Sequence, residues 1–348
     1  MEKKMRERVK ERMQGFCRAC PRCDGRACAG EVPGMGGAGS GSTFIRNVEA
    51  LSSKTLIMRT LHKVSEPDVS STLFGRTLDM PVLAAPVGGV EFNMTRKISE
   101  GEYLEAVARG AAAAGTLPCG GDGEVEEIFE STEALLGRDG VEGIPFIKPW
   151  ESGRIRERIR RIEAMGVPAF GMDVDAAGLV TLSKMGHSVY PKTPEELQKI
   201  AGSTDIPFIV KGIMSADEAK EAVEAGAQGI VVSNHGGRVL DSCEATVNVL
   251  PDIVEALEAA ALKRESLEKG CTILVDGGIR NGTDIFKMLA LGADAVLIGR
   301  PIAIAAIGGG AAAVEAEFRR LKSELVHAMV MTGTQSLRAI SKRSLHGT

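Results

Sequence analysis

The sequence predicts an α/β protein whose eight strands close into a (β/α)8 TIM barrel, preceded by an N-terminal Cys- and Gly-rich extension. Eight short apolar runs between residues 81 and 299 alternate with amphipathic segments of helical period, and most of the runs are bounded by Gly or Pro. Nearly continuous apolar runs of this kind are typical of parallel strands that helices cover on both faces. Eight such units occupy about 250 residues, which a chain of 348 residues accommodates. A doubly wound open sheet is the alternative fold that this pattern leaves open.

The expected elements follow one another in regular order. The strands are residues 81–87, 115–119, 144–149, 168–175, 206–212, 229–234, 271–278 and 294–299. The helices include residues 100–115, 124–137, 154–166, 215–226 and 282–292. In the fourth of these helices, Ser215 is suited to cap the N-terminus and Gly226 to end the helix. We expect residues 1–50 to form the extension and residues 51–348 to form the barrel.

Composition and charge restrict the kinds of partner. The formal net charge is -4 and the pI is near 5.9, so no basic field attracts nucleic acid and a small-molecule substrate is expected instead. The N-terminal segment is charged and lacks the apolar centre of a signal peptide, and no apolar run long enough to span a bilayer follows it. We therefore expect a cytoplasmic protein without a membrane span, whose cysteines stay reduced unless they bind metal or do redox chemistry.

Polar side chains follow the apolar runs at the points where the strands should end. They are Asp173, Asp175, Lys211, Ser233, Asn234, His235, Asp276 and Arg300. Because parallel barrels carry their active sites at the C-terminal ends of the strands, these residues are the first candidates for a site. The imidazole of His235 can act as a base, and the guanidinium of Arg238 can grip a carboxylate. The alternative for His235 alone is an ordinary turn with a buried structural histidine.

Residues 231–241, VVSNHGGRVLD, resemble the signature of the FMN-dependent 2-hydroxy-acid dehydrogenases and oxidases, the family of lactate and glycolate oxidases. Further matches to the family's patterns lie in residues 61–89, 274–301 and 331–341, in the family's order and spacing. The resemblance implies a barrel flavoenzyme that oxidises a small L-2-hydroxy acid, similar to lactate or glycolate, to the 2-oxo acid.

The resemblance also implies roles for the catalytic residues. His235 is expected to remove a proton from the substrate, and Asp175 to support the resulting imidazolium. Asp173 lies on the same face of the strand by its two-residue period, so the choice between the two aspartates stays open. Lys211 is expected near flavin N1 and O2, where a cation stabilises the reduced ring. Arg238 is expected to bind the substrate carboxylate.

Two glycine-containing turns after the seventh and eighth strands form the expected FMN phosphate site, the place where barrels commonly bind phosphate. The resemblance assigns the phosphate to Gly278, Arg280, Gly299 and Arg300, with Asp276 on the ribityl side. The other expected FMN contacts are Ala85, Pro86, Val87, Lys148, Lys211, Ser233 and Gly277. The expected substrate contacts are Trp150, His235 and Arg238.

The chain departs from the family at several positions. Trp150 stands where the family has a tyrosine, Lys148 where it has a flavin-contacting glutamine, and Gly121 where it has a serine. The family's arginine after the fourth strand is missing, which leaves Lys184 or His187 as candidate substitutes. These differences weaken the prediction of the substrate pocket more than that of the flavin site.

The extension contains four cysteines in twelve residues. The spacing of Cys17, Cys20, Cys23 and Cys28 is C-x2-C-x2-C-x4-C, which is close to the spacings that bind an iron-sulfur cluster or zinc. A metal site, a reactive thiol cluster and structural cysteines remain open as interpretations. The Gly-rich residues 34–42 do not follow a predicted strand, so we expect a flexible lid there rather than a dinucleotide-binding turn.

Two other functional classes compete with the hydroxy-acid enzyme. One is an FMN-dependent isomerase resembling the type 2 isopentenyl diphosphate isomerases, and the other is a non-catalytic metal or redox protein built around the cysteines. The set of Lys211, His235 and Arg238 favours hydroxy-acid chemistry over both. The electron acceptor, whether oxygen, a quinone or a protein, stays open, and the family resemblance implies a homo-tetramer or homo-octamer.

Overall fold

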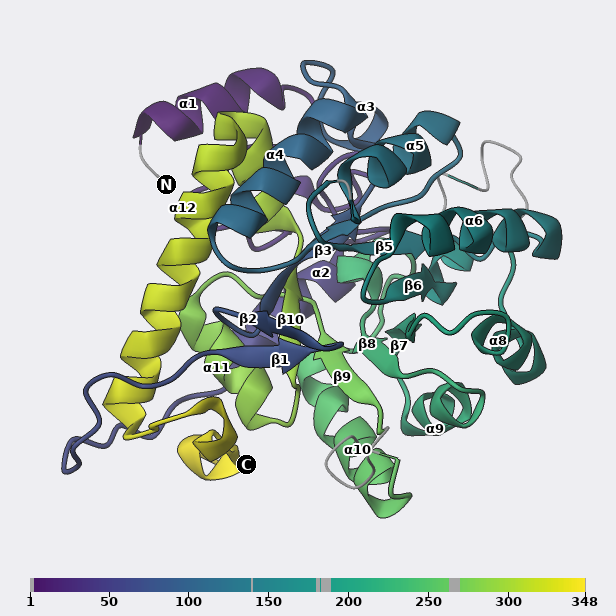
Figure 1. Cartoon of the computed structure of the whole chain (residues 1–348). Coiled ribbons are helices and arrows are strands. Elements are labelled where there is room, and N and C mark those ends of the chain that lie inside the picture. The colour runs from purple at the N-terminus through teal and green to yellow at the C-terminus, as the bar shows by residue number, and fades with distance from the viewer. Residues whose placement is uncertain (1–2, 139, 180–181, 183–188, 263–269, 348) are drawn as a thin grey trace.

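The computed structural model describes residues 3–138, 140–179, 182, 189–262 and 270–347. Eight parallel strands close into a barrel in the order β10-β3-β4-β5-β6-β7-β8-β9 (Figure 1). The strands are β3 (Val82–Val87), β4 (Pro118–Gly120), β5 (Ile144–Ile147), β6 (Phe170–Asp173), β7 (Phe208–Ile213), β8 (Gly229–Val232), β9 (Thr272–Val275) and β10 (Ala295–Ile298). Each strand falls on one of the eight predicted apolar runs, so the barrel is confirmed and the open sheet is wrong.

Helices follow the strands and surround the barrel. They are α3 (Val90–Asn93), α4 (Glu100–Ala113), α5 (Glu126–Leu135), α6 (Ser152–Met165), α8 (Pro194–Ala201), α9 (Ala216–Glu224), α10 (Thr246–Ala259), α11 (Gly282–Ala290) and α12 (Arg300–Thr332). Side-chain caps fix several starts: the Ser215 hydroxyl accepts the Glu218 N–H, as predicted, and Ser99 forms a capping box with Glu102. Helix α9 ends just before Gly226, which has a left-handed φ of 102°.

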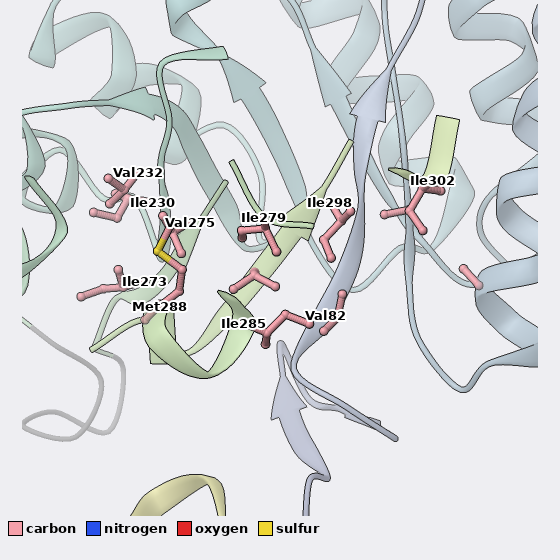
Figure 2. Close-up of a cluster of buried hydrophobic side chains, with 14 of the residues drawn as sticks. Val82, Ile230, Val232, Ile273, Val275, Ile279, Ile285, Met288, Ile298 and Ile302 are labelled. Atoms are coloured by element: carbon pink, nitrogen blue, oxygen red, sulfur yellow. The ribbon is translucent and has the colours of Figure 1, made fainter. Parts of the chain in front are cut away.

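The two-residue period of the strands separates two apolar layers. Inside the barrel lies a layer that includes Phe146, Ile209 and Val231. The alternate side chains point outward and pack beneath the helices. Figure 2 shows part of this outer layer, in which Ile230 and Ile273 of neighbouring strands are drawn with other buried aliphatic side chains. Both faces of each strand are therefore buried, which explains why the runs are nearly continuous in apolar residues.

A short hairpin closes the barrel at the N-terminal ends of its strands. Its strands are β1 (Ser71–Leu73) and β2 (Arg76–Leu78), which pair antiparallel. Leu73 and Leu78 belong to the inner apolar layer, and the Phe74 ring lies against Gly229 at the start of β8. With this end filled by side chains, the opposite end is the one that remains available for a site.

The extension is packed onto the barrel. Helix α1 (Lys3–Arg12) lies against α12, where Arg12 donates to the Ile307 carbonyl at 2.9 Å. Helix α2 (Ser42–Ser53) packs against α10 and α11 and runs across residue 50, where we expected the boundary of the barrel. The Gly-rich segment between them is tied down as well: Ala38 donates to the Gly237 carbonyl at 2.8 Å. The expected lid is thus hydrogen-bonded to the loop that follows β8.

Helix α12 is long and apolar enough to cross a membrane by length and composition alone. It is bent at Gly310, where φ is 67°, and it packs against α4, α11 and α1. Val314, Phe318 and Leu321 are fully buried in these contacts. Packing against neighbouring helices therefore accounts for the apolar side chains of α12 in this structure.

Gly282 provides a test of the close contact between α11 and α12. A Cβ atom at this position would overlap the backbone of Glu324 and Leu325, which cannot move like a flexible side chain. We expect Gly282→Ala to lower the free energy of unfolding by about 1 to 3 kcal/mol, the usual cost of overpacking. The matched control is Gly101→Ala on α4, where the nearest atom to an added Cβ is 3.7 Å away. Urea unfolding measures both, and equal midpoints for the two variants would contradict the close approach.

Candidate active site

A cavity of about 270 Å³ opens at the C-terminal ends of the strands. The strand period explains its polar wall, because the residue two positions after an inner-layer residue also points inward. Lys148 follows Phe146 in this way, and Lys211 follows Ile209. The same step gives Ala85, Gly121, Ser233, Asp276 and Gly299, and Asp173 lies two positions after Gly171, which faces the inner Phe146 ring. The predicted polar residues therefore form the top layer of the barrel interior.

His235 lies beside this layer, directly after β8, and lines the cavity. Its Nδ1 is 3.1 Å from both carboxylate oxygens of Asp175, in the turn after β6. Asp175 is therefore the aspartate that contacts His235, and the alternative of Asp173 is not realised. A Cβ at Gly212 would come within 2.5 Å of the Asp175 Cβ, so glycine there lets β7 approach this pair closely. With Nδ1 engaged by Asp175, Nε2 is the ring nitrogen left to accept a proton.

Asp173 instead joins two lysines. Lys148 Nζ lies 2.6 Å from Asp173 Oδ2, and Lys211 Nζ lies 3.3 Å from Oδ1. Lys211 also reaches Asp175 at 3.7 Å and His235 Nδ1 at 3.3 Å. Burial alone would lower the pKa of Lys211, but the surrounding carboxylates outweigh burial and raise it. Burial would raise the pKa of Asp173, but the two lysines outweigh it and hold that pKa below its usual range. Lys211 therefore remains charged at the cavity wall.

Three arginines line the same cavity: Arg238, Arg280 and Arg300. Within the part of the chain that the structure describes, none of them forms an ion pair with a carboxylate. Burial lowers the pKa of Arg300 to about 9 and that of Arg238 to about 10. Their hydrogen bonds go to neutral oxygens instead: Arg300 donates to the carbonyls of Met35 and Gly36, and Arg238 to Gly34 and Asn93. Cations held this way are suited to anionic ligands.

The turns after β9 and β10 position Arg280 and Arg300. Gly277 and Gly278 both have left-handed φ values, of 98° and 79°, and a Cβ at Gly278 would overlap the Asn47 carbonyl of α2. Arg300 begins α12, so the positive end of that helix faces the cavity wall. Asp276 accepts the Ser233 hydroxyl at 2.9 Å, and burial raises its pKa. A phosphate at these turns would meet both helix and guanidinium charges.

Most of the predicted site residues line the cavity. They are Ala85, Pro86, Val87, Lys148, Lys211, His235, Arg238, Asp276, Gly277, Gly278, Arg280, Gly299 and Arg300. Asp175 and Ser233 do not line the cavity, but they contact His235 and Asp276, which do. The candidates Lys184 and His187 fall outside the described residues.

Trp150 lies apart from the other two expected substrate contacts, His235 and Arg238. It is only 2% exposed and is not among the residues that line the cavity. Its indole N–H donates to Asp122 Oδ2 at 2.6 Å, and the guanidinium of Arg154 covers the ring at 3.8 Å. The ring is thus held in the wall behind the cavity, because a buried indole N–H needs an acceptor and Asp122 supplies one there.

The sequence analysis did not predict two residues that line the cavity, Asn93 and Glu100. Asn93 of α3 accepts from Arg238 at 2.9 Å, and the carboxyl of Glu100 accepts the Glu91 N–H at 3.3 Å. Burial raises the pKa of Glu100 to about 7, although backbone N–H groups oppose the shift. Asn93 follows β3 in a stretch without motif or periodic pattern, and Glu100 begins a predicted helix whose pattern does not distinguish a buried carboxyl from an exposed one.

The four extension cysteines do not enter this cavity. They line a second, smaller and largely enclosed cavity beside Arg280, and all four are free thiols. Among the described residues, no group of three or more His, Cys, Asp or Glu side chains is arranged as the ligand set of one metal ion. The structure therefore brings the four predicted metal ligands to one cavity, but it does not arrange them as the ligands of a single metal ion.

The fold and this cavity define a (β/α)8 barrel with a His–Asp pair beside a cavity that three arginines line. The model of the family described as FMN-dependent dehydrogenase matches residues 34–185 and 178–347. The chain is 33% identical to L-lactate dehydrogenase from Pseudomonas putida (strain GB-1), over 89% of this chain and 92% of that protein. It is 32% identical to 4-hydroxymandelate oxidase from Amycolatopsis orientalis, over 90% and 94%. It is also 30% identical to a peroxisomal (S)-2-hydroxy-acid oxidase from Oryza sativa subsp. japonica, over 88% of each.

The solved structures agree with these relatives. Mandelate oxidase with (S)-2-phenylpropionate superposes with a TM-score of 0.76 at 30% identity, covering 98% of this chain and 96% of that one. Another solved mandelate oxidase, a mutant with the same TM-score of 0.76, contains a C4a-OH-FMN adduct. The chain belongs to the FMN-dependent 2-hydroxy-acid dehydrogenase and oxidase family, as its motifs predicted, and FMN is its cofactor. These relatives do not favour the isomerase alternative.

The buried carboxyl of Glu100 predicts a pH dependence of stability. Its pKa of about 7 lies above its ordinary value of 4.5, so the folded protein holds a proton that the unfolded chain releases. The contribution of this proton to the free energy of unfolding is present in full below about pH 4.5 and is lost as the pH rises through 7. Between pH 5 and 8, the free energy of unfolding should fall by about 1 to 3 kcal/mol more in the native protein than in Glu100→Gln.

Urea unfolding at several pH values measures this difference. The control is Glu130→Gln, which removes an exposed carboxylate from the neighbouring helix α5. If Glu100→Gln and Glu130→Gln follow parallel pH profiles, the carboxyl of Glu100 does not titrate as described.

Proposed function

We propose that the protein oxidises a small L-2-hydroxy acid, similar to lactate or glycolate, to the 2-oxo acid with His235 as the base. One observation carries this proposal: the His235–Asp175 pair and three arginines without carboxylate partners in the described chain share one cavity. A hydroxy acid presents a carboxylate for a cation and a proton for a base, and FMN presents a phosphate for the other cations.

The residues present fit FMN. The phosphate would be held by Gly278, Arg280, Gly299 and Arg300, where two turns and the start of α12 meet. The remaining contacts would come from Ala85, Pro86, Val87, Lys148, Lys211, Ser233, Asp276 and Gly277. When bound, FMN supplies the acceptor for the two electrons that leave the substrate. Lys148 and Lys211 would face its electron-rich side, where positive charge favours the reduced form.

His235 would accept the proton that the substrate loses. Asp175 holds Nδ1, which fixes the ring and leaves Nε2 to take the proton that the hydroxy acid loses. The Asp175 carboxylate then stabilises the imidazolium, as carboxylates do beside catalytic histidines. Arg238 would bind the substrate carboxylate, because its charge has no other carboxylate partner among the described residues. Asn93 keeps the guanidinium in place.

The apolar part of the cavity bears on the choice of substrate. Phe92, Leu179 and Leu182 line it, whereas Trp150 does not, so the substrate's side chain would contact aliphatic and phenyl surface rather than an indole. Relatives act on lactate and on 4-hydroxymandelate according to their names. We favour the smaller acids, and keep a cytoplasmic location and a homo-tetramer or homo-octamer as further parts of the proposal.

The FMN phosphate site is tested by Arg300→Ala. The guanidinium donates a charge-assisted hydrogen bond to a phosphate, so its loss should weaken FMN binding by about 1 to 3 kcal/mol, or roughly 5- to 150-fold. Fluorescence titration of the apoprotein with FMN measures the Kd. Arg319→Ala removes an exposed arginine from the same helix and should leave the Kd unchanged. Equal Kd values for the two variants would exclude Arg300 from the phosphate site.

The base is tested by His235→Ala. The variant should retain FMN, because its phosphate site is intact, but reduce it at least about 100-fold more slowly, the usual contribution of a general base. Stopped-flow bleaching of the flavin by L-lactate or glycolate without air gives the rate. Exposed His327 on α12 offers the control, His327→Ala. A native protein whose flavin no small 2-hydroxy acid bleaches would refute the proposed substrate class.

A further inference from the structure

The hydroxy-acid reaction leaves one built feature of the chain unused. Residues 17–28 fold into a loop that directs Cys17, Cys20, Cys23 and Cys28 to a single cavity. The other walls include Ala27, Met35 and Ile304. Four thiols that converge from twelve residues onto an enclosed, largely apolar space are not explained by core packing, because aliphatic side chains would fill it better.

Contacts with the rest of the protein hold this loop in shape. Arg6 donates to the Ala19 carbonyl at 2.8 Å, and Met35 donates to the Phe16 carbonyl at 3.0 Å. Arg280 donates to the Cys23 carbonyl at 3.0 Å. The N–H of Ala19 points at the Cys17 sulfur at 3.3 Å, a contact that stabilises a thiolate. The loop thus resembles a formed binding site more than a random surface segment.

Positive charge surrounds the sulfurs. Arg280 Nη2 lies 3.7 Å from Cys23 Sγ, and the charge of Arg300 acts on Cys28. Guanidinium groups beside the sulfurs can balance the negative charge of thiolates that bind a cation.

We propose that Cys17, Cys20, Cys23 and Cys28 bind a four-iron, four-sulfide cluster. Soft thiolates select zinc or iron-sulfur clusters over harder cations, and the C-x2-C-x2-C portion matches the spacing at which cysteines bind such clusters. Zinc would draw four sulfurs to within about 3.8 Å of one another around one point. These sulfurs instead surround a cavity, as a cluster that binds each thiolate at a separate iron requires.

The position of the cluster indicates a role in electron transfer from the flavin. This role rests on the proposed function. Arg280 contacts Cys23 on one side and lines the FMN cavity on the other, and Met35 lines both cavities, so the two sites are direct neighbours. Oxidation of one hydroxy acid to a 2-oxo acid releases two electrons and two protons. The electrons would leave one at a time through the cluster and reduce two molecules of a one-electron carrier protein, while the protons pass to solvent.

Metal and cofactor analysis of the full chain, purified without air, tests the site. We expect about four iron and four acid-labile sulfide per chain, together with an electron paramagnetic resonance signal after dithionite reduction. Cys20→Ser should lose most of the iron and retain FMN. Cys243→Ser, which changes a partly exposed cysteine outside the loop, should retain both.

The native protein alone decides the outcome even if Cys20→Ser fails to fold. About one zinc per chain without sulfide, or no metal with four titratable thiols, would overturn the cluster. The electron route has its own test: L-lactate or glycolate that bleaches the flavin without air should also produce the signal of the reduced cluster. A bleached flavin beside an oxidised cluster would overturn the route. Iron and sulfide without bound FMN would instead refute the proposed function and leave the cluster standing.

Discussion

The closed parallel barrel imposes one constraint on which every part of the site depends: each strand turns every second side chain inward. Apolar residues such as Phe146 and Ile209 fill the barrel interior. The inward-pointing positions that follow them in each strand therefore lie at the open end of the barrel. Charged side chains there cannot retreat to solvent across the strand without reversing its register, because the other face is buried under helices. Lys148, Asp173 and Lys211 are therefore held together, and their opposite charges make the arrangement stable.

The extension completes the site by a different means. Its carbonyl oxygens, from Gly34, Met35 and Gly36, accept the hydrogen bonds of Arg238 and Arg300. A carbonyl satisfies a guanidinium without neutralising it, whereas a carboxylate would compete with an anionic ligand for the same charge. The buried amide pair of Asn47 and Asn234, at 2.9 to 3.0 Å, then fixes α2 against the loop that carries His235. The extension is in this sense part of the active site rather than an appendage.

The sequence predicted what local pattern determines. The eight strands follow from apolar runs, and the residues that end them follow from the rule that barrel sites lie at strand ends. Contacts between segments that are far apart in the sequence could not be predicted from local patterns. Trp150 turns into the wall because Asp122, at the end of the preceding strand, accepts its N–H, and Asn93 enters the cavity through a short helix without a motif. The expected boundary at residue 50 falls inside α2, whose limits depend on its packing and not on a change in composition.

The two aspartates after β6 show why spacing alone could not assign their roles. Both lie at the C-terminal end of β6, but Asp173 is the last residue of the strand and points inward, while Asp175 lies in the turn beyond it. Asp173 is 2.6 Å from Lys148, the lysine that stands where relatives in this family are expected to have a glutamine. An uncompensated second cation beside Lys211 would be costly in a buried site, so a lysine at position 148 requires Asp173 to be ionised. That requirement commits Asp173 to the lysines and leaves Asp175 alone to orient His235.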